Sequence, residues 1–379
     1  MTHAIAIPTR RAVFAGAVGF AASAAAPPPG LDRLITAQMK RGGIPGLSAA
    51  AARHGKTVHA RGYGFADLAR SRPVTDQTMF HVASITKTVT ATAVMQLDGQ
   101  GKLRLDAPVS PHLDFPLVHP RFPDRPITFR QLLTHTSGIS DARYYEVDFR
   151  SLGKDAVLPL GDFLRQYLTP GGRHYGADQC FAAAPGAAWD YSNVGYALLG
   201  YVAGRIGGRD MRTLTQQRIF APLGMRRTSW TLGGTPAALR TTPYELEDGR
   251  LKAVEPVGFP DWPAGMIRST AGDMVRFAGA AANAGGPILP APLQAEMLAM
   301  TRPPGLPDWL TGQGLGWQES RLGGAPLPNH WGGDPGVFTV AYLDPARHTA
   351  AVVLTNTSAT AASKAAVQAI VAGLLAFAA

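Results

Sequence analysis

The stretch Ser84-Ile85-Thr86-Lys87 is the part of the sequence that says most about the fold. A serine three residues before a lysine puts a hydroxyl and an amine on one face of a helix, one turn apart. Apolar residues follow at helical spacing until Gly99 and Gly101, so we expect a helix from Ser84 to about Gly99. The serine then lies at the helix N-terminus, which favours developing negative charge. A lysine kept neutral by burial at this position can accept the serine proton.

A second copy of the same spacing occurs at Ser151-Leu152-Gly153-Lys154. A glycine lies inside this copy and no apolar helical period follows it, so we interpret it as a loop. The copy at Ser84 is therefore the candidate pair of nucleophile and base, and the copy at Ser151 serves as an internal control.

Two distant fragments could complete a catalytic set. Tyr191-Ser192-Asn193 precedes an apolar helical pattern and is expected on a short loop, where a tyrosine can shuttle a proton if nearby cations lower its pKa. The asparagine there can donate to a substrate carbonyl. His330-Trp331-Gly332-Gly333 is expected to open a strand over residues 337–343, and its glycines allow the backbone and a substrate to approach closely. Alone, each fragment has an ordinary interpretation, as a turn or as a structural histidine.

Composition and charge restrict the class of protein. The 379 residues are 46% hydrophobic and 16% charged, which is typical of a globular protein. The net charge is +10, but lysine and arginine are scattered singly, so we expect no nucleic-acid binding. Cys180 is the one cysteine; this excludes an intrachain disulfide, and we expect a packed side chain and not a nucleophile. Because the sequence has neither H-E-x-x-H nor G-x-S-x-G, we expect no metal or other cofactor and no α/β-hydrolase site.

Both ends of the chain carry apolar stretches. Residues 1–26 combine Arg10 and Arg11 with an apolar run and small residues near Ala26, the pattern of an export signal. The paired arginines resemble a twin-arginine signal, and an ordinary secretory signal is the alternative. Either signal predicts export to the bacterial periplasm or the extracellular space. The stretch Ala365–Ala379 is short and rich in alanine, so we expect a terminal helix packed on a sheet and no stable membrane insertion.

Strand and helix patterns divide the mature chain, residues 27–379, into three parts. Strand patterns lie near both ends, over residues 46–53, 57–65, 314–319, 337–343 and 350–356. Helical patterns flank them, and residues of approximately 110–260 alternate helical patterns with connections rich in proline and glycine. We therefore expect an α+β fold, in which an antiparallel sheet built from both termini is flanked by helices and interrupted by an inserted, mostly helical region.

Taken in order, the three motifs S-x-x-K, Y-x-N and H-x-G resemble those of the serine β-lactamase and penicillin-binding protein superfamily. Further stretches resemble its class C β-lactamase-like branch, which includes D-alanyl-D-alanine carboxypeptidases, D-aminopeptidases and class C-like esterases. These stretches are Met79–Ala83, Leu132–Ile139, Pro222–Met225 and Ala264–Met266. Because the fragments cover nearly all the mature chain, it is identified as a member of this superfamily, with a β-lactamase/transpeptidase-like fold.

The resemblance implies a role for each candidate residue. Ser84 would be the acylated nucleophile, Lys87 its proton acceptor, and Tyr191 a second general base or acid. The other candidates would bind the substrate or its oxyanion: Asn193, His330, Gly332, and the backbone N–H groups of Ser84 and Gly333. His135 and Trp189 belong to family stretches but have no clear chemical role, so we interpret both as structural.

The third motif departs from the pattern of most β-lactamases, which have a lysine where this chain has His330. A histidine is only partly charged near neutral pH, so we expect inefficient β-lactam hydrolysis but an intact acyl-enzyme mechanism. The favoured function is a serine hydrolase that acts on amide or ester bonds of small substrates, with D-amino-acid peptides or esters first. A class C-type β-lactamase and a non-catalytic penicillin-binding sensor domain are the alternatives. We expect loops around residues 140–185 and 302–312 to form the pocket walls, and the sequence does not set an oligomeric state.

Overall fold

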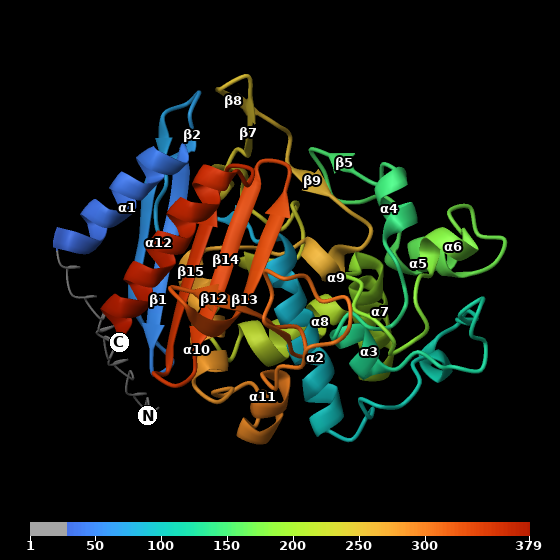
Figure 1. Cartoon of the computed structure of the whole chain (residues 1–379). Coiled ribbons are helices and arrows are strands. Elements are labelled where there is room, and N and C mark those ends of the chain that lie inside the picture. Colours follow the sequence, from blue (N-terminus) through green and yellow to red (C-terminus); the bar gives the residue numbers. More distant parts are fainter. Residues whose placement is uncertain (1–28) are drawn as a thin grey trace, which may run out of the picture.

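An eight-stranded antiparallel sheet combines strands from early and late parts of the chain (Figure 1). In the computed structural model, which describes residues 29–379, the strand order is β11-β12-β13-β14-β15-β1-β2-β3. The strands are β1 (Gly46–Arg53), β2 (Lys56–Asp67), β3 (Arg72–Pro73), β11 (Gly312–Gln313), β12 (Gln318–Leu322), β13 (Ala325–Asp334), β14 (Val337–Asp344) and β15 (Thr349–Thr355). The early and late strands meet where β1 pairs with β15. This arrangement confirms the expected α+β fold, while the export signal predicted for residues 1–26 lies outside the described residues.

Strand β1 has a run of four alanines, Ala49–Ala52, and helices pack on both of its faces. Ala50 and Ala52 join one hydrophobic cluster, and Ala49 and Ala51 join another on the opposite face, as the alternation of side chains along a strand requires. Helix α10 (Ala271–Ala282) covers the first face. Helices α1 (Pro29–Gly42) and α12 (Ala361–Ala378) cover the second face. The sheet is therefore the middle layer between two layers of helices.

The C-terminal apolar stretch forms α12, and Thr360 caps its first turn by accepting a hydrogen bond from the Ser363 N–H at 3.0 Å. The helix packs against β15, β1 and α1, as predicted for this stretch. Within the part of the chain that the structure describes, α12 is also the one helix whose length and composition would suit a membrane span. Its buried face is occupied by the sheet.

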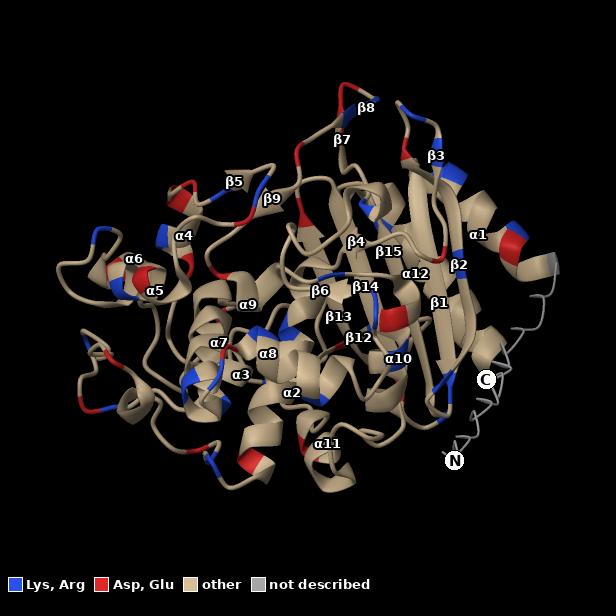
Figure 2. Cartoon of the chain, turned by 180° about the vertical axis from the view of Figure 1, so that it is seen from behind, with Lys and Arg blue, Asp and Glu red and all other residues tan. Residues whose placement is uncertain are grey.

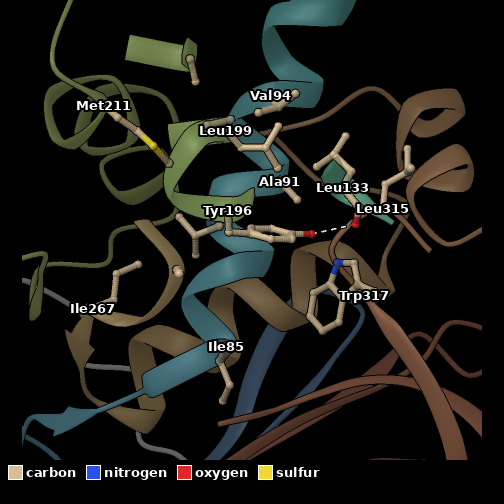
Figure 3. Packing of buried hydrophobic residues seen from close by; sticks show 14 of the residues in the cluster. Ile85, Ala91, Val94, Leu133, Tyr196, Leu199, Met211, Ile267, Leu315 and Trp317 are labelled. Atoms are coloured by element: carbon tan, nitrogen blue, oxygen red, sulfur yellow. Dashed lines mark hydrogen bonds between the residues drawn. The ribbon is translucent and has the colours of Figure 1, made fainter. Parts of the chain in front are cut away.

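The helix after Ser84 is α2 (Thr86–Gly99), which lies between the sheet and the helical region (Figure 3). Almost all of its residues from Thr86 to Leu97 are buried. Its hydroxyl groups find partners inside the protein: Thr88 Oγ1 donates to Ile85 O at 2.7 Å, and Thr90 Oγ1 donates to Pro263 O at 2.6 Å. A helix packed on all sides is held firmly, so it fixes the positions of the side chains at its N-terminus.

Between α2 and α10 the chain forms mostly short helices and short strands, and one further short strand, β4, precedes α2. The helices are α3 (Phe129–Leu133), α4 (Ala142–Glu146), α5 (Leu160–Leu168), α6 (Ala177–Cys180), α7 (Asn193–Gly207), α8 (Met211–Thr215) and α9 (Trp262–Gly265). The strands are β4 (Phe80–His81), β10 (Arg268–Ser269) and β6 (Thr228–Ser229) in one small sheet, β5 (Ser151–Leu152) with β9 (Val257–Gly258), and β7 (Tyr244–Glu247) with β8 (Arg250–Ala253). A further short helix, α11 (Ala291–Met297), follows α10. The limits expected for the helical insertion, residues 110–260, stay a prediction.

Two of the strand predictions were wrong in detail. Residues 314–319 do not form one strand, because β11 ends at Gln313 and β12 begins at Gln318. Gly316 lies between them in the left-handed region, with φ +83°, which turns the chain out of an extended conformation.

The second correction concerns the third motif. His330-Trp331-Gly332-Gly333 does not open the strand that begins at Val337; it lies in a strand of its own, β13, which pairs antiparallel with β14. The sequence does not predict β13 as a strand, because it contains two prolines and two glycines, which are rare in strands.

Candidate active site

Ser84 lies in the 3-10 turn Ala83–Ile85, which leads directly into α2, so the predicted place at a helix N-terminus is confirmed. Thr339 of β14 holds this turn to the sheet, because its Oγ1 donates to Val82 O at 2.8 Å. β13 approaches the same turn at Gly332, where a Cβ would lie 2.5 Å from Val82 O. Only glycine fits there, and the Ser84 side chain is left facing a cavity of about 590 Å³.

Lys87 is fully buried and lies one helical turn after the serine. Its Nζ lies 3.1 Å from Ser84 Oγ, 2.7 Å from Asn193 Oδ1 and 2.9 Å from Ala264 O. A neutral amine can donate its two N–H groups to Asn193 and Ala264 and keep its lone pair for the Ser84 hydroxyl. Burial lowers the pKa of Lys87 from 10.5 to about 8, although nearby carboxylates oppose this shift. The geometry and the pKa therefore suit a general base.

Tyr191 lies beside the same two groups and lines the cavity. Its ring centroid is 4.8 Å from Lys87 Nζ, and the ring stacks on His135 with centroids 4.4 Å apart. Burial raises the pKa of Tyr191 above its ordinary value, and contact with the Ser84 hydroxyl lowers it only in part. The condition named for proton shuttling, a pKa lowered by nearby cations, is therefore not met, and the phenol stays protonated near neutral pH.

His135 positions the loop that carries the tyrosine. Its Nδ1 accepts a hydrogen bond from the Ser192 N–H at 3.1 Å, and its carbonyl accepts one from the Asp190 N–H at 2.8 Å. Its ring also packs against Trp189 and Tyr196, with centroids 5.9 Å and 4.9 Å away. The Tyr196 hydroxyl points into the packed interior, where it donates to a backbone carbonyl (Figure 3). These contacts support the structural roles expected for His135 and Trp189.

Asp141 is a buried residue of the site that the sequence analysis did not identify. Its carboxylate accepts hydrogen bonds from the N–H groups of Asn193 at 2.6 Å and Val194 at 3.1 Å, and from Ser192 Oγ at 2.9 Å. It therefore binds the N-terminus of α7, where unpaired N–H groups and the helix dipole favour a negative charge. The sequence signal for it was weak: an aspartate two residues beyond the family stretch Leu132–Ile139.

Asn193 begins α7 and links the base to the cavity wall. Its Oδ1 accepts a hydrogen bond from Lys87 Nζ at 2.7 Å, and its Nδ2 donates to Tyr145 Oη at 3.3 Å. Asn193 and Tyr145 both line the cavity. The amide thus orients Lys87, and the contact with a substrate stays a prediction.

His330 differs from the expectation of a partly charged residue lining the site. Trp331 packs in the cluster beneath α1 and α12, so strand alternation points the His330 side chain to the opposite face, toward Lys87. The imidazole is buried beside the cavity and is not part of its lining, with Nδ1 2.8 Å from Trp331 O. Burial and the Lys87 charge lower the pKa of His330 to about 3, so the ring is neutral. Gly333 lines the cavity, as an oxyanion-hole residue must.

The cavity walls come from three segments of the chain, at residues 144–150, 259–266 and 333–335, and Ser84, Tyr191 and Asn193 complete the lining. The lining residues are Ser84, Tyr144–Arg150, Tyr191, Asn193, Phe259, Asp261, Gly265, Met266 and Gly333–Pro335. The expected wall at residues 140–185 is present in part, but residues 302–312 do not line the cavity, and the segments at 259–266 and 333–335 take their place. A cavity of this size accommodates a small organic molecule.

Two carboxylates line the cavity near Lys87. Burial raises the pKa of Asp261 to about 6 and, together with the Asp261 charge, that of Asp334 to about 7. Carboxyl groups with such pKa values are common at functional sites. Among residues 29–379, no group of three or more potential metal-binding side chains is present.

The other candidates from the sequence lie elsewhere. Ser151 is in β5, paired with Gly258 of β9, and Lys154 lies in the following turn, so this second copy of the motif is not helical, as predicted. Cys180 is fully buried, and burial raises the pKa of its thiol, which agrees with a packed side chain.

The sheet, the buried base and the nucleophile at a helix N-terminus define a β-lactamase-fold serine hydrolase. Residues 31–374 match the family described as Beta-lactamase, and the chain belongs to that family. Esterase EstB of Burkholderia gladioli is 32% identical over 375 residues, which cover 86% of this chain and 90% of the relative.

Solved structures show the same fold. The octameric penicillin-binding protein homologue from Pyrococcus abyssi has a TM-score of 0.76 at 25% identity, over 92% of this chain and 76% of that one. The D-amino acid amidase from Ochrobactrum anthropi SV3 has a TM-score of 0.74 at 24% identity, over 92% of this chain and 99% of that one. The superfamily expected from the sequence is therefore confirmed.

Proposed function

We propose that this protein hydrolyses small esters and amides through an acyl-enzyme on Ser84. The observation that carries the proposal is the buried Lys87 amine, which lies 3.1 Å from Ser84 Oγ and has a pKa lowered to about 8. A neutral amine at hydrogen-bond distance from a hydroxyl is the arrangement that general-base activation of a serine needs.

In the acylation step, Ser84 Oγ attacks the substrate carbonyl carbon while its proton passes to Lys87 Nζ. The carbonyl oxygen becomes an oxyanion, which the backbone N–H groups of Ser84 and Gly333 would stabilise, each contributing roughly 3 kcal/mol. The bond to the leaving alcohol or amine then breaks, and the leaving group takes up a proton. The protonated phenol of Tyr191, beside Ser84, is placed to donate that proton and to regain one from Lys87.

In the deacylation step, a water molecule attacks the ester carbonyl on Ser84. A base at Lys87 or Tyr191 takes the water proton, Ser84 Oγ leaves and recovers a proton, and a carboxylic acid is released. Both steps use the same oxyanion hole and the same pair of proton-transfer groups, so one fixed constellation is enough for turnover.

Esters and amides are favoured over β-lactams because of the charges at the site. β-Lactams carry a carboxylate, and a permanent cation at the third motif would bind it. Here that position is His330, which is buried and neutral, and Arg150 is the one basic residue that lines the cavity. The 32% identity with an esterase over nearly the whole chain supports the same choice.

Intact-mass spectrometry after incubation with 4-nitrophenyl acetate, penicillin G or a D-Ala-D-Ala peptide tests the proposal. We expect transient acylation by the acetate ester and its complete loss in Ser84→Ala. Ser151→Ala is the matched control, because it removes the serine of the second S-x-x-K copy, which is not helical.

The outcomes separate the three hypotheses. Rapid release of penicilloate would favour the class C-type β-lactamase, and a stable penicilloyl adduct without turnover of any ester would favour the penicillin-binding sensor. Acylation of Ser84→Ala, or loss of turnover in Ser151→Ala, would overturn the assignment of the nucleophile.

We also propose that the protein is exported, on the basis of the arginine pair and the apolar run in residues 1–26. Expression in a bacterial host followed by fractionation tests this. Substitution of both arginines by lysine should block a twin-arginine route and leave ordinary secretion intact.

A further inference from the structure

The charge of the cavity is opposite to the charge of the chain. The chain has a net charge of +10, and basic and acidic residues are interspersed along the described part of the chain (Figure 2). The cavity in front of Ser84, however, is lined by four acidic residues and by Arg150 as the one basic residue. Two of the four, Glu146 and Asp148, are exposed at their side chains and paired with arginines. The other two, Asp261 and Asp334, lie deeper.

The buried charges around the base do not balance. Three carboxylates act electrostatically on Lys87: Asp141 and Asp261 are buried, and the side chain of Asp334 is 20% exposed. Among the residues that the structure describes, Arg268 is the other buried cation nearby. The buried imidazoles of the site are neutral, because burial lowers the pKa of each. When Lys87 is neutral, as a base must be, three carboxylates face one guanidinium. An unbalanced buried charge is costly unless a partner or a proton supplies the opposite charge.

The three carboxylates differ in how well they are satisfied. Asp141 accepts three hydrogen bonds at the N-terminus of α7 and needs no further partner. Asp261 is 5% exposed and accepts one hydrogen bond, from Tyr144 Oη at 3.1 Å; its other oxygen has none from another residue in the described part of the chain. Asp334 lies beside the neutral His81, whose Nε2 is 3.5 Å from Oδ2 and donates instead to Gly265 O at 2.7 Å. The guanidinium of Arg268 is already hydrogen-bonded, since it donates to two backbone carbonyls.

We propose that Asp261 and Asp334 bind a positively charged ammonium group of the substrate, so that the enzyme selects amine-bearing esters and amides. This inference rests on the proposed function and names its substrate class. An ammonium group has three N–H donors, which can satisfy oxygens from both carboxylates while the scissile carbonyl lies at Ser84. A substrate carboxylate in the same place would be repelled, because both lining groups carry its own sign.

Three methyl esters of nearly equal shape test the proposal. Methyl 3-aminopropanoate, methyl butanoate and monomethyl succinate carry a positive, a neutral and a negative end group. Each is measured at pH 8 as a competitor of 4-nitrophenyl acetate hydrolysis, so that binding at the site is detected even where the ester itself turns over slowly. For the wild type we expect the amine ester to compete about tenfold better than the neutral ester, and the succinate ester to compete worst.

Isosteric variants show whether the two carboxylates cause the preference for the amine ester. Asp261→Asn and Asp334→Asn should each reduce the preference for the amine ester over the neutral ester by about tenfold. The preference is compared within each variant, so a change in overall rate does not affect it. Asp162→Asn is the control for net charge: it removes an exposed carboxylate of α5 outside the cavity lining, and should leave the preference within about twofold.

Several results would overturn the proposal: no preference in the wild type, a preference for the succinate ester, or variants that behave like the control. Thermal melting shows whether each variant is folded, and the two substitutions lie in different segments, so one misfolded variant leaves the other as the test. If Ser84 is never acylated, the proposed function fails instead. In that case, NMR titration of Ser84→Ala with 3-aminopropanamide, butanamide and succinamate measures their binding. It decides the charge preference without any turnover.

Discussion

The pH dependence of the reaction should report the neutral form of Lys87. Burial places its pKa at about 8 in place of the ordinary 10.5. At pH 7 this raises the neutral fraction of the amine from about 0.03% to about 9%, a gain of roughly 300-fold, equivalent to about 3 kcal/mol. Because the neutral amine is the active form, kcat/KM should rise about tenfold per pH unit below pH 8 and level off above it.

The assay is kcat/KM for 4-nitrophenyl acetate between pH 5.5 and 9 for the wild type and for Lys87→Arg. A guanidinium keeps the positive charge but cannot release its proton in this range, so the arginine variant should lose at least about a thousandfold in activity. Lys154→Arg is the matched control, because this exposed lysine occupies the same place in the second S-x-x-K copy, and it should leave both the rate and the profile unchanged.

Two results would refute the reasoning. A profile that is flat from pH 6 to pH 9 would mean that no group with a pKa near 8 controls the reaction. An arginine variant with more than about a tenth of wild-type activity would mean that Lys87 acts through its charge alone.

Two further predictions concern β13. Asp334→Asn should raise the free energy of unfolding by at most about 4 kcal/mol at pH 8 but by less than about 2 kcal/mol at pH 5. The pKa of Asp334 rises from 3.8 to about 7 on folding, so the charged carboxylate destabilises the folded state. This destabilisation reaches its full size only above the folded pKa, and the asparagine removes it. Denaturant unfolding at both pH values measures this, and an equal effect at both would contradict it. Gly332→Ala should lower thermal stability and activity because its Cβ would collide with Val82 O, whereas Gly333→Ala, with no atom nearer than 3.9 Å, should melt like the wild type.

The sequence predicts most of the fold because the sheet and its covering helices follow simple periodic patterns. Strand β1 and helix α12 are rich in small and apolar residues, and both lie where the patterns place them. Strand β13 was missed for a physical reason: the close approach of Gly332 to the Ser84 turn requires a residue that lowers strand propensity. A functional requirement thus overrode the local signal.

The candidate site was also predicted only in part from the sequence. Ser84, Lys87 and Tyr191 were found because their spacing along the chain carries the signal, and the structure brings all three together. Asp261 and Asp334 were not found, because an isolated aspartate is usually a surface residue and only the folded chain shows that these two line one cavity. The direction of the Tyr191 pKa shift could not be read from the sequence, because burial raises this pKa more than the hydrogen bond with Ser84 lowers it.

The unusual third motif and the carboxylates of the cavity have one common consequence. In most β-lactamases, as the resemblance implies, a lysine on this strand supplies the positive charge that holds a ligand carboxylate. Here the strand carries a neutral His330, and four residues later Asp334 enters the cavity lining. The proton-transfer groups around Ser84 need neither charge, so in the proposed mechanism the acyl-enzyme chemistry would be preserved while the charge facing the substrate would be inverted. A fold of this kind can therefore change the charge of the substrate it selects through a few lining positions, without any change in its nucleophile or base.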